Sequence, residues 1–294
     1  MRNASTWRDD RLGRPRSVTL SSGPLRFHDT GGDGLPVLVF AHGYLVNANI
    51  WRKLVPLLRA EHRCITPDLP LGSHVVPVNR DADLSPPGIA GMIAELLEAL
   101  DLDEVTLFGN DSGGAYSQLV AAWHPERLAR LVLATCETPE CTWPPTPGGF
   151  GLLKATAAHP ASYRALYQVL RLPRTWRWRN TYGWLAKYPI EAPAMWSYLR
   201  PVLDRAEIRH DGRKAIGAVS ARYSRAAAEE LVRRFDRPVL LLWAEEDHVF
   251  PVAHAQRYTA RLPNAELVRV PDSYTYLSED QPEAVAKHLR DWFA

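Results

Sequence analysis

The sequence predicts an α/β protein: a mostly parallel β-sheet with helices on both faces and a helical lid inserted between two strands. Continuous apolar runs of strand length, such as PVLVFAHG at residues 36–43, are typical of strands that are buried on both faces. Segments with helical spacing of apolar residues separate these runs, and regular alternation of strand and helix indicates a parallel sheet. The alternation lapses after Cys136 and resumes at Arg237, which indicates an insertion between two strands.

The first predicted element is a hairpin, because SVTL (17–20) and PLRFHD (24–29) flank the turn residues SSG. The elements that follow rest on the two patterns described above. They are a strand at 36–43, a helix at 48–60, a strand at 64–69, a loop at 70–88, a helix at 89–100, a strand at 105–110, a helix that ends near 124 and a strand at 130–135.

Residues 139–235 form the predicted lid, since this stretch is rich in Pro, Trp, Tyr and Arg and shows helical patches without strand-like runs. The sheet then resumes with a strand at 237–247, a helix at 253–262, a strand at 265–272 and a final helix at 282–294. We therefore expect a core made of residues 17–138 and 236–294, the lid at 139–235 and an N-terminal arm at 1–16.

The composition narrows the classes of function. Of 294 residues 46% are apolar, which is ample for a large core, and the net charge of +2 gives no electrostatic reason to expect a nucleic-acid partner. The charged N-terminus is not followed by an apolar segment, and no apolar run approaches the ~18 residues of a membrane span. Three cysteines without histidines at metal-ligand spacing suit a reducing compartment. We expect a cytoplasmic protein without a metal or cofactor, acting on a small hydrophobic molecule.

The stretch VTLFGNDSGGAY (105–116) carries the strongest chemical signal. A strand that ends in a small residue, then X, a nucleophile, X and a second small residue before a helix is a nucleophile elbow. Centred on Asp111 the two small positions are Gly109 and Gly113, whereas centring on Ser112 would place Asn110 at one of them. We therefore predict Asp111 as the nucleophile. Ser112 as nucleophile and Asp111 as a simple helix cap are the alternatives.

The order of motifs resembles the α/β-hydrolase superfamily. The chain has HG at 42–43 after a strand, the elbow GNDSGG, an acid in WAEED after a late strand, and PDSYTYLSEDQPE near the C-terminus. An aspartate at the elbow resembles the haloalkane dehalogenase and epoxide hydrolase branches. The resemblance implies that Asp111 attacks carbon to form an ester, that the N–H groups of Tyr44 and Ser112 form an oxyanion hole, and that Asp247 is the acid that orients a catalytic histidine.

One position departs from the family pattern. Where the family has its histidine, this chain has Thr275, and a threonine hydroxyl cannot act as the base that hydrolyses the ester. His248 follows Asp247 and is the nearest replacement in sequence, but neighbours of the acid usually point elsewhere. We expect His42 to be structural and most of the other histidines to lie at the surface. They are His28, His62, His74, His124, His159, His210, His254 and His288.

Without an imidazole, Asp111 and Asp247 would face one pocket with no cation between them. Like charges raise one pKa, whereas the N-terminus of the elbow helix lowers that of Asp111, so one acid could be protonated near neutral pH. This arrangement would suit general acid–base chemistry.

The two branches differ in what assists the leaving group. Haloalkane dehalogenases typically have a tryptophan after the nucleophile that holds the leaving halide, where this chain has Ser112. Epoxide hydrolases use lid tyrosines to protonate the oxygen of the opening ring. The tyrosine candidates are Tyr163, Tyr167, Tyr182, Tyr188 and Tyr198. The tryptophans Trp143, Trp176, Trp178, Trp184 and Trp196 add to an aromatic lid that could form the core, the wall of an apolar cavity, or both.

Four functions remain open at this point. The first is an epoxide-hydrolase-like or dehalogenase-like enzyme with Asp111 as nucleophile. The others are a non-hydrolytic acid–base enzyme, a binding protein without catalysis, and a serine esterase through Ser112. Substrate-binding roles are expected for Tyr44, Ser112, Thr275 and Tyr182.

Overall fold

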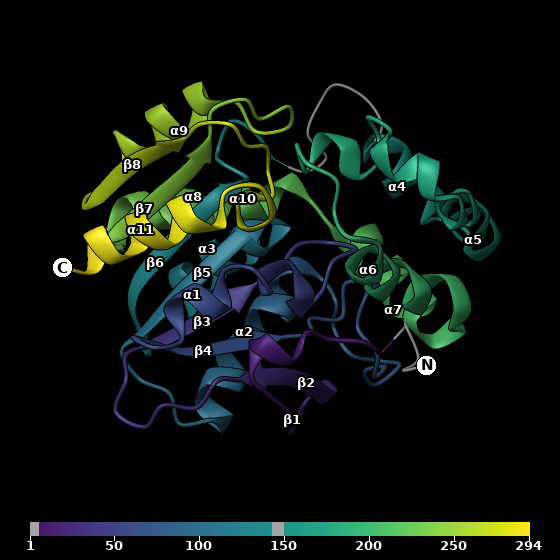
Figure 1. Cartoon of the computed structure of the whole chain (residues 1–294), viewed down its shortest axis with the longest axis horizontal. Helices are drawn as coiled ribbons and strands as arrows, with labels where there is room; N and C mark the ends of the chain where they lie inside the picture. Colours follow the sequence, from purple (N-terminus) through teal and green to yellow (C-terminus); the bar gives the residue numbers. More distant parts are fainter. Residues whose placement is uncertain (1–5, 143–149) are drawn as a thin grey trace.

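The computed structural model describes residues 6–142 and 150–294 of the chain, so the predicted lid residue Trp143 lies outside the described residues (Figure 1). Its strands form one eight-stranded sheet in the order β1-β2-β4-β3-β5-β6-β7-β8. The strands are β1 (Arg14–Leu20), β2 (Gly23–Asp29), β3 (Val37–Ala41), β4 (Arg63–Pro67), β5 (Val105–Asp111), β6 (Leu128–Cys136), β7 (Val239–Ala244) and β8 (Ala265–Val270).

The sheet is antiparallel at one edge and parallel everywhere else. β1 pairs with β2 and β2 with β4 in antiparallel fashion, whereas the pairs from β4 through β3, β5, β6 and β7 to β8 are all parallel. Every residue of β5 and β7 is buried, as expected for apolar runs covered on both faces. The predicted fold class is confirmed. β1 begins at Arg14, three residues before the expected start at Ser17.

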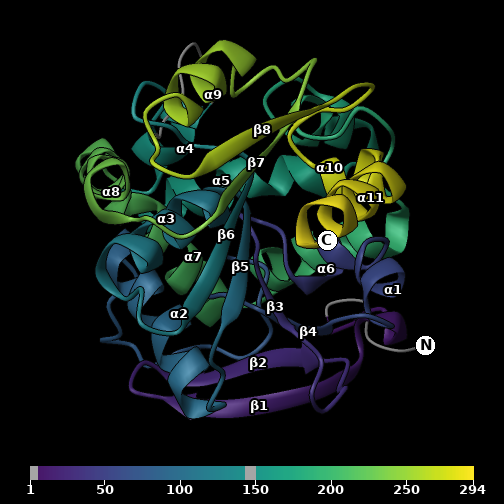
Figure 2. The same cartoon turned by 90° about the vertical axis from the view of Figure 1, so that its left-hand side faces the viewer.

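Helices cover both faces of the sheet (Figure 2). On one face lie α2 (Pro86–Ala99), α3 (Ser112–Trp123) and α8 (Ala221–Arg234), and on the other lie α1 (Val55–Leu58), α10 (Leu277–Asp280) and α11 (Pro282–Phe293). The helix α9 (Val252–Thr259) joins β7 to β8, and two short 3-10 helices, η1 (Asp10–Leu12) and η2 (Ala48–Trp51), occur near the N-terminus.

The predicted continuous helix at 48–60 is wrong. The structure has η2 followed by the one-turn helix α1, with Pro56 in the first turn of α1. Proline lacks an N–H group and its ring clashes with the preceding turn, so Pro56 is favoured in the first turn of a helix and disfavoured in the interior of one.

Between β6 and β7 the described residues form only helices. Besides α8 these are α4 (Phe150–Thr156), α5 (Pro160–Gln168), η3 (Val169–Arg171), η4 (Pro173–Arg177), η5 (Tyr182–Trp184), α6 (Ala192–Asp204) and α7 (Ala206–Ala218). Figure 1 shows α4 to α7 gathered beside the sheet, far from the C-terminus. We call residues 150–234 the helical insertion. The division into core and lid stays a prediction.

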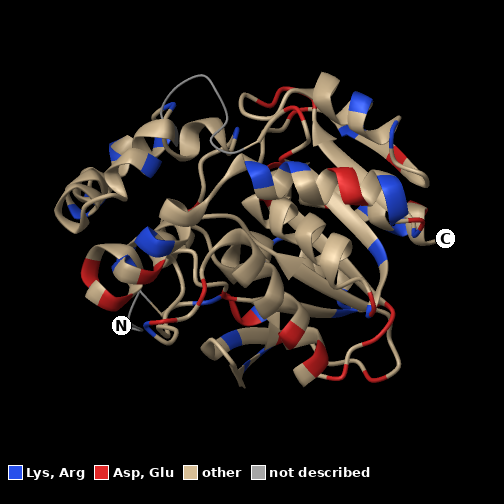
Figure 3. Ribbon diagram, turned by 180° about the vertical axis from the view of Figure 1, so that it is seen from behind, with Lys and Arg blue, Asp and Glu red and all other residues tan. Residues whose placement is uncertain are grey.

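Charged side chains of both signs are interspersed over the elements seen in Figure 3. Within residues 6–142 and 150–294, no helix has both the length and the apolar character needed to cross a membrane.

The junction of β5 and α3 is held by very close backbone contacts. A Cβ atom at Gly109 would overlap the Ser117 hydroxyl and the Gly113 carbonyl, and a Cβ at Gly113 would overlap the Ala41 carbonyl on β3. Backbone atoms of a packed sheet cannot move aside as a flexible side chain can. Glycine is therefore required at positions 109 and 113, two residues before and two residues after Asp111.

We expect Gly113→Ala to destabilise the protein by more than about 4 kcal/mol or to prevent folding, because the overlap is with backbone. Gly91→Ala in α2 is the matched control, since nothing lies within 4 Å of a Cβ there. In this helix interior the same change should stabilise by about 0.5–1 kcal/mol. Urea unfolding of both variants measures this. A Gly113→Ala variant as stable as wild type would contradict the packing argument.

Candidate active site

Asp111 occupies the corner between β5 and α3. Its backbone has φ 55° and ψ −135°, a conformation that non-glycine residues rarely adopt, and its side chain makes no capping hydrogen bond to α3. Ser112 is the first residue of the helix. The geometry therefore favours Asp111 over Ser112 as the elbow residue and disagrees with a simple capping role. Unusual backbone conformations of this kind cluster at functional sites.

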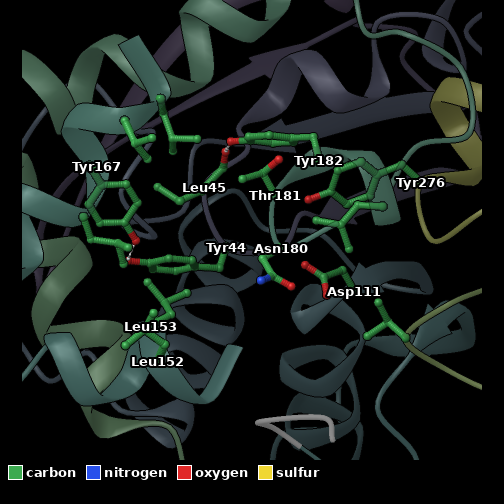
Figure 4. A pocket seen from close by; sticks show the side chains of 15 residues that line it. Tyr44, Leu45, Asp111, Leu152, Leu153, Tyr167, Asn180, Thr181, Tyr182 and Tyr276 are labelled. Carbon is green, nitrogen blue, oxygen red and sulfur yellow. Dashed lines mark hydrogen bonds between the residues drawn. The ribbon is translucent and has the colours of Figure 1, made fainter. Parts of the chain in front are cut away.

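A cavity of about 150 Å³ opens over Asp111, with walls that are mainly leucine and tyrosine (Figure 4). An engineered apolar cavity of about this size binds benzene. The lining residues are Tyr44, Leu45, Asp111, Leu152, Leu153, Leu166, Tyr167, Val169, Leu170, Asn180, Thr181, Tyr182, Leu185, Val249 and Tyr276. The expectation that Asp247 faces the same pocket is wrong, because neither Asp247 nor Thr275 lines it. No described tryptophan lines it either, so the aromatic wall consists of tyrosines.

Thr275 contacts the acid that the family pattern pairs with histidine. Its hydroxyl donates a hydrogen bond to Asp247 Oδ2 at 2.7 Å, and the Val249 N–H donates to Asp247 Oδ1 at 2.7 Å. The Asn110 amide donates to the carbonyl of Thr275 at 2.8 Å, which ties this loop to the end of β5. The structure thus brings Thr275 and Asp247 together, as the resemblance implies for the acid and its partner, and the group that contacts the acid is a neutral hydroxyl.

No histidine takes over the missing role within residues 6–142 and 150–294. His248 is exposed, and its ring packs on Tyr274 and Trp184 with centroid distances of 4.4 Å and 5.7 Å. His42 accepts a hydrogen bond from the Leu69 N–H at 2.9 Å, and burial lowers its pKa to about 4, as expected for a structural histidine. Of the eight other histidines, five are exposed or partly exposed, and three are buried: His28, His62 and His74.

The two N–H groups that were expected to form the oxyanion hole already have hydrogen-bond partners within the protein. The Tyr44 N–H donates to the Ser112 hydroxyl oxygen at 2.9 Å, and the Ser112 hydroxyl is also hydrogen-bonded to the Tyr116 phenol. The Ser112 N–H donates to the Asp111 carboxylate, which lies directly against the backbone of Gly43. Of the two expected donors, only the Ser112 N–H reaches Asp111. The small Ser112 side chain causes this, because its hydroxyl competes for the Tyr44 N–H.

The two acids have raised pKa values. Burial raises the pKa of Asp111 to about 7, the Ser112 N–H opposes this rise, and the charges of Glu137 and Asp247 add to it. Burial also raises the pKa of Asp247 to about 6, against the hydrogen bonds from Phe250, Thr275 and Val249. The direction agrees with the sequence-based hypothesis, but burial outweighs like-charge repulsion as its cause.

Glu137 is a third buried acid near the elbow, and sequence reasoning missed it. It directly follows β6, its charge acts on Asp111, and it accepts a hydrogen bond from the Ser224 hydroxyl at 2.5 Å. Its position after a strand adjacent to β5 was the available signal, because the carboxyl ends of neighbouring parallel strands meet at one edge of the sheet.

The hydroxyl groups of the tyrosine candidates from the insertion are all hydrogen-bonded to other protein groups. Tyr182 donates to the Leu45 carbonyl at 2.6 Å, Tyr198 to Glu279 at 3.4 Å, and the exposed Tyr188 to Asp272 at 2.6 Å. The hydroxyls of Tyr163 and Tyr167 both bond to that of Tyr44, with the Tyr167 contact at 3.1 Å. Tyr182 and Tyr167 line the cavity, but neither presents a free donor to it.

Comparison with known proteins gives the family. Residues 36–282 match the model of the alpha/beta hydrolase fold family, and the chain belongs to this family. It is 27% identical to the uncharacterized hydrolase YugF of Bacillus subtilis, over 88% of this chain and 90% of that protein. It is 26% identical to haloalkane dehalogenase 2 of Mycobacterium tuberculosis, over 98% of this chain and 94% of that protein.

The fold is shared with solved dehalogenase structures. A variant of the haloalkane dehalogenase DatA from Agrobacterium tumefaciens superposes with a TM-score of 0.78 at 18% identity, covering 97% of this chain and 99% of that one. The family match and these relatives confirm the predicted resemblance and the expectation of an enzyme of the hydrolase class on this fold.

Stability should depend on pH through Asp111. Because its pKa is about 7 when folded and near 3.9 when unfolded, folding favours the protonated form. The stability that the protonated acid contributes is complete below pH ~4 and is lost as pH rises to ~7, on the order of a few kcal/mol. Asp111→Asn should remove this loss, so the variant should gain on wild type between pH 4 and 8. Urea unfolding across this range measures the difference, and parallel curves would contradict the raised pKa.

Proposed function

We propose that this chain is an enzyme in which the Asp111 carboxylate attacks an epoxide or alkyl halide of small hydrophobic character and forms an alkyl ester. The observation that carries the proposal is the position of Asp111, which is held on a strained corner and lines a cavity whose wall is mostly apolar. A carboxylate that is stripped of water and lies beside a bound carbon atom is a strong nucleophile.

The attack needs no base, but it needs the ionised form of Asp111. With a pKa of about 7, the carboxyl is only partly ionised at neutral pH. Formation of the ester removes the charge from Asp111, where burial had raised the pKa, and passes it to the leaving atom of the substrate. Relatives named haloalkane dehalogenase support a halide or a similar electrophile as the substrate.

Hydrolysis of the ester is the step that this site supports poorly. It requires a base next to the ester carbonyl, and Thr275 supplies only a neutral hydroxyl that already donates to Asp247. We therefore propose that the ester is long-lived.

The three cysteines, all buried and free, support a cytoplasmic location for this reaction.

A second candidate function is proton transfer without a covalent intermediate. The pKa values of about 7 for Asp111 and about 6 for Asp247 favour it, because groups that titrate near neutral pH are suited to general acid–base catalysis. A serine esterase is less well supported, since Ser112 does not line the cavity. A binding protein without catalysis remains the outcome expected if no substrate is altered.

Hexene oxide should add one hydroxyhexyl group to Asp111 and hexyl iodide one hexyl group, seen by intact-mass and peptide mass spectrometry. Only the ionised carboxyl attacks, so the rate should rise with pH through about 7 and level off above it. Asp111→Asn is the matched control and should remain unmodified. Alteration of a substrate without an adduct, lost in the same variant, would favour proton transfer, and binding with no alteration would favour the binding protein.

Thr275→His should convert a stalled ester into one that turns over. The new imidazole would replace a hydroxyl that lies 2.7 Å from Asp247 Oδ2, so the acid is placed to orient it as a base. We expect loss of the Asp111 adduct with release of diol or alcohol. Thr275→Val keeps the shape without a base and should retain the adduct. Persistence of the ester in a folded Thr275→His variant would contradict the argument.

A further inference from the structure

The hydroxyl groups around the cavity differ in whether they have a hydrogen-bond partner within the protein. Tyr182 donates to the Leu45 carbonyl, Tyr44 and Tyr167 bond to each other, and the Thr181 hydroxyl donates to the Thr175 carbonyl at 2.7 Å. Among the cavity-lining residues that the structure describes, Tyr276 alone has a buried hydroxyl without a hydrogen-bond partner. A buried and unsatisfied hydroxyl is costly and calls for an explanation.

Tyr276 is held rigidly in this position. Its side chain is 0% exposed, and its N–H donates to the Leu185 carbonyl of the helical insertion at 2.7 Å. Figure 4 shows its hydroxyl directed into the cavity on the side where Asp111 and Tyr182 lie. Burial and then the charge of Asp111 raise the pKa of Tyr276 well above its usual value, which places the phenol within the electrostatic reach of the carboxylate.

We propose that the Tyr276 hydroxyl binds the leaving atom of the substrate and donates its proton to an epoxide oxygen as Asp111 opens the ring. The inference rests on the proposed nucleophilic role of Asp111, and it deepens that role by favouring epoxides as the substrate class. It also moves the proton donor from the tyrosines of the insertion, which the family resemblance implied, to the residue that follows Thr275.

The step balances as follows. An Asp111 carboxylate oxygen forms a bond to one ring carbon, the bond from that carbon to the epoxide oxygen breaks, and its electron pair stays on the oxygen. The Tyr276 proton moves to this oxygen, so the products are a neutral hydroxyalkyl ester and a tyrosinate that later regains a proton from water. Because Asp111 loses its charge as the ester forms, the repulsion that disfavours tyrosinate is removed at the moment the proton leaves.

The leaving group decides how much this donor matters. An alkoxide is a poor leaving group that gains a great deal from protonation, whereas iodide leaves unprotonated and gains only a hydrogen bond. General acid assistance contributes about 10²–10⁴-fold to such steps. A site with one free phenol and a mostly apolar wall is therefore better matched to an epoxide than to a halide.

The test compares Tyr276→Phe with wild type on hexene oxide and hexyl iodide, which share the same chain length. By intact-mass kinetics, we expect the rate of ester formation from the epoxide to fall by about 100-fold or more and that from the iodide by less than about 10-fold. Tyr258→Phe is the matched control, since this buried tyrosine does not line the cavity and its hydroxyl donates to Gln118 Oε1 at 2.9 Å, and the ratio of the two rates should stay at the wild-type value.

The outcomes separate the two proposals. Ester formation in wild type with an unchanged epoxide-to-iodide rate ratio in Tyr276→Phe would overturn the role of Tyr276 and leave the nucleophilic role of Asp111 standing. Absence of ester with both compounds in wild type would overturn the nucleophilic role and this inference with it. An equal fall in both rates would indicate a structural effect of the substitution and would also overturn the inference.

Discussion

The single-residue turn from β5 into α3 is the constraint on which the site depends. Asp111 alone makes this turn, at φ 55°, inside a core where its neighbours at two residues on either side must be glycine. The corner presses the carboxylate against the backbone of Gly43 and presents it to the cavity, so water is excluded from most of it. Both the reactivity that we propose for Asp111 and its raised pKa follow from this burial.

No cation is paired with Asp111 or Asp247 among the described residues of this site. In the described part of the chain neither Asp111 nor Asp247 belongs to an ion pair, and their hydrogen bonds come from backbone N–H groups and the Thr275 hydroxyl. A histidine at position 275 would add a cation whenever it is protonated and would lower both pKa values. In the proposed reaction, threonine at this position leaves the ester without a base for hydrolysis, and it leaves both acids without a cation that would lower their pKa values.

The sequence predicted the features that depend on local pattern. The apolar runs located the strands, and the spacing of Gly109 and Gly113 located the elbow, because both signals are set by residues close in sequence. Pro56, which divides the helix predicted at 48–60, is a local signal of the same kind. Two features were not predictable: the hydrogen bond from the Tyr44 N–H to Ser112 and the direction of the Tyr276 side chain. Both join segments far apart in sequence and depend on side-chain orientation.

Thr275 and Tyr276 are neighbours in one short loop, and the proposed reaction assigns their positions to different steps, ester hydrolysis and ester formation. Neighbouring side chains there point to different groups: Thr275 donates to Asp247 behind the elbow, and Tyr276 faces the cavity in front of it. Bond breaking at the substrate needs a donor on the cavity side, whereas ester hydrolysis needs a base at the carbonyl of Asp111. In the proposed reaction Tyr276 supplies the first group, and no side chain described at this site supplies the second. The proposal therefore places the chemistry in the step that forms the ester. A substrate whose leaving atom stays attached, as in an epoxide, would then leave a hydroxyl group facing Tyr276 in the cavity.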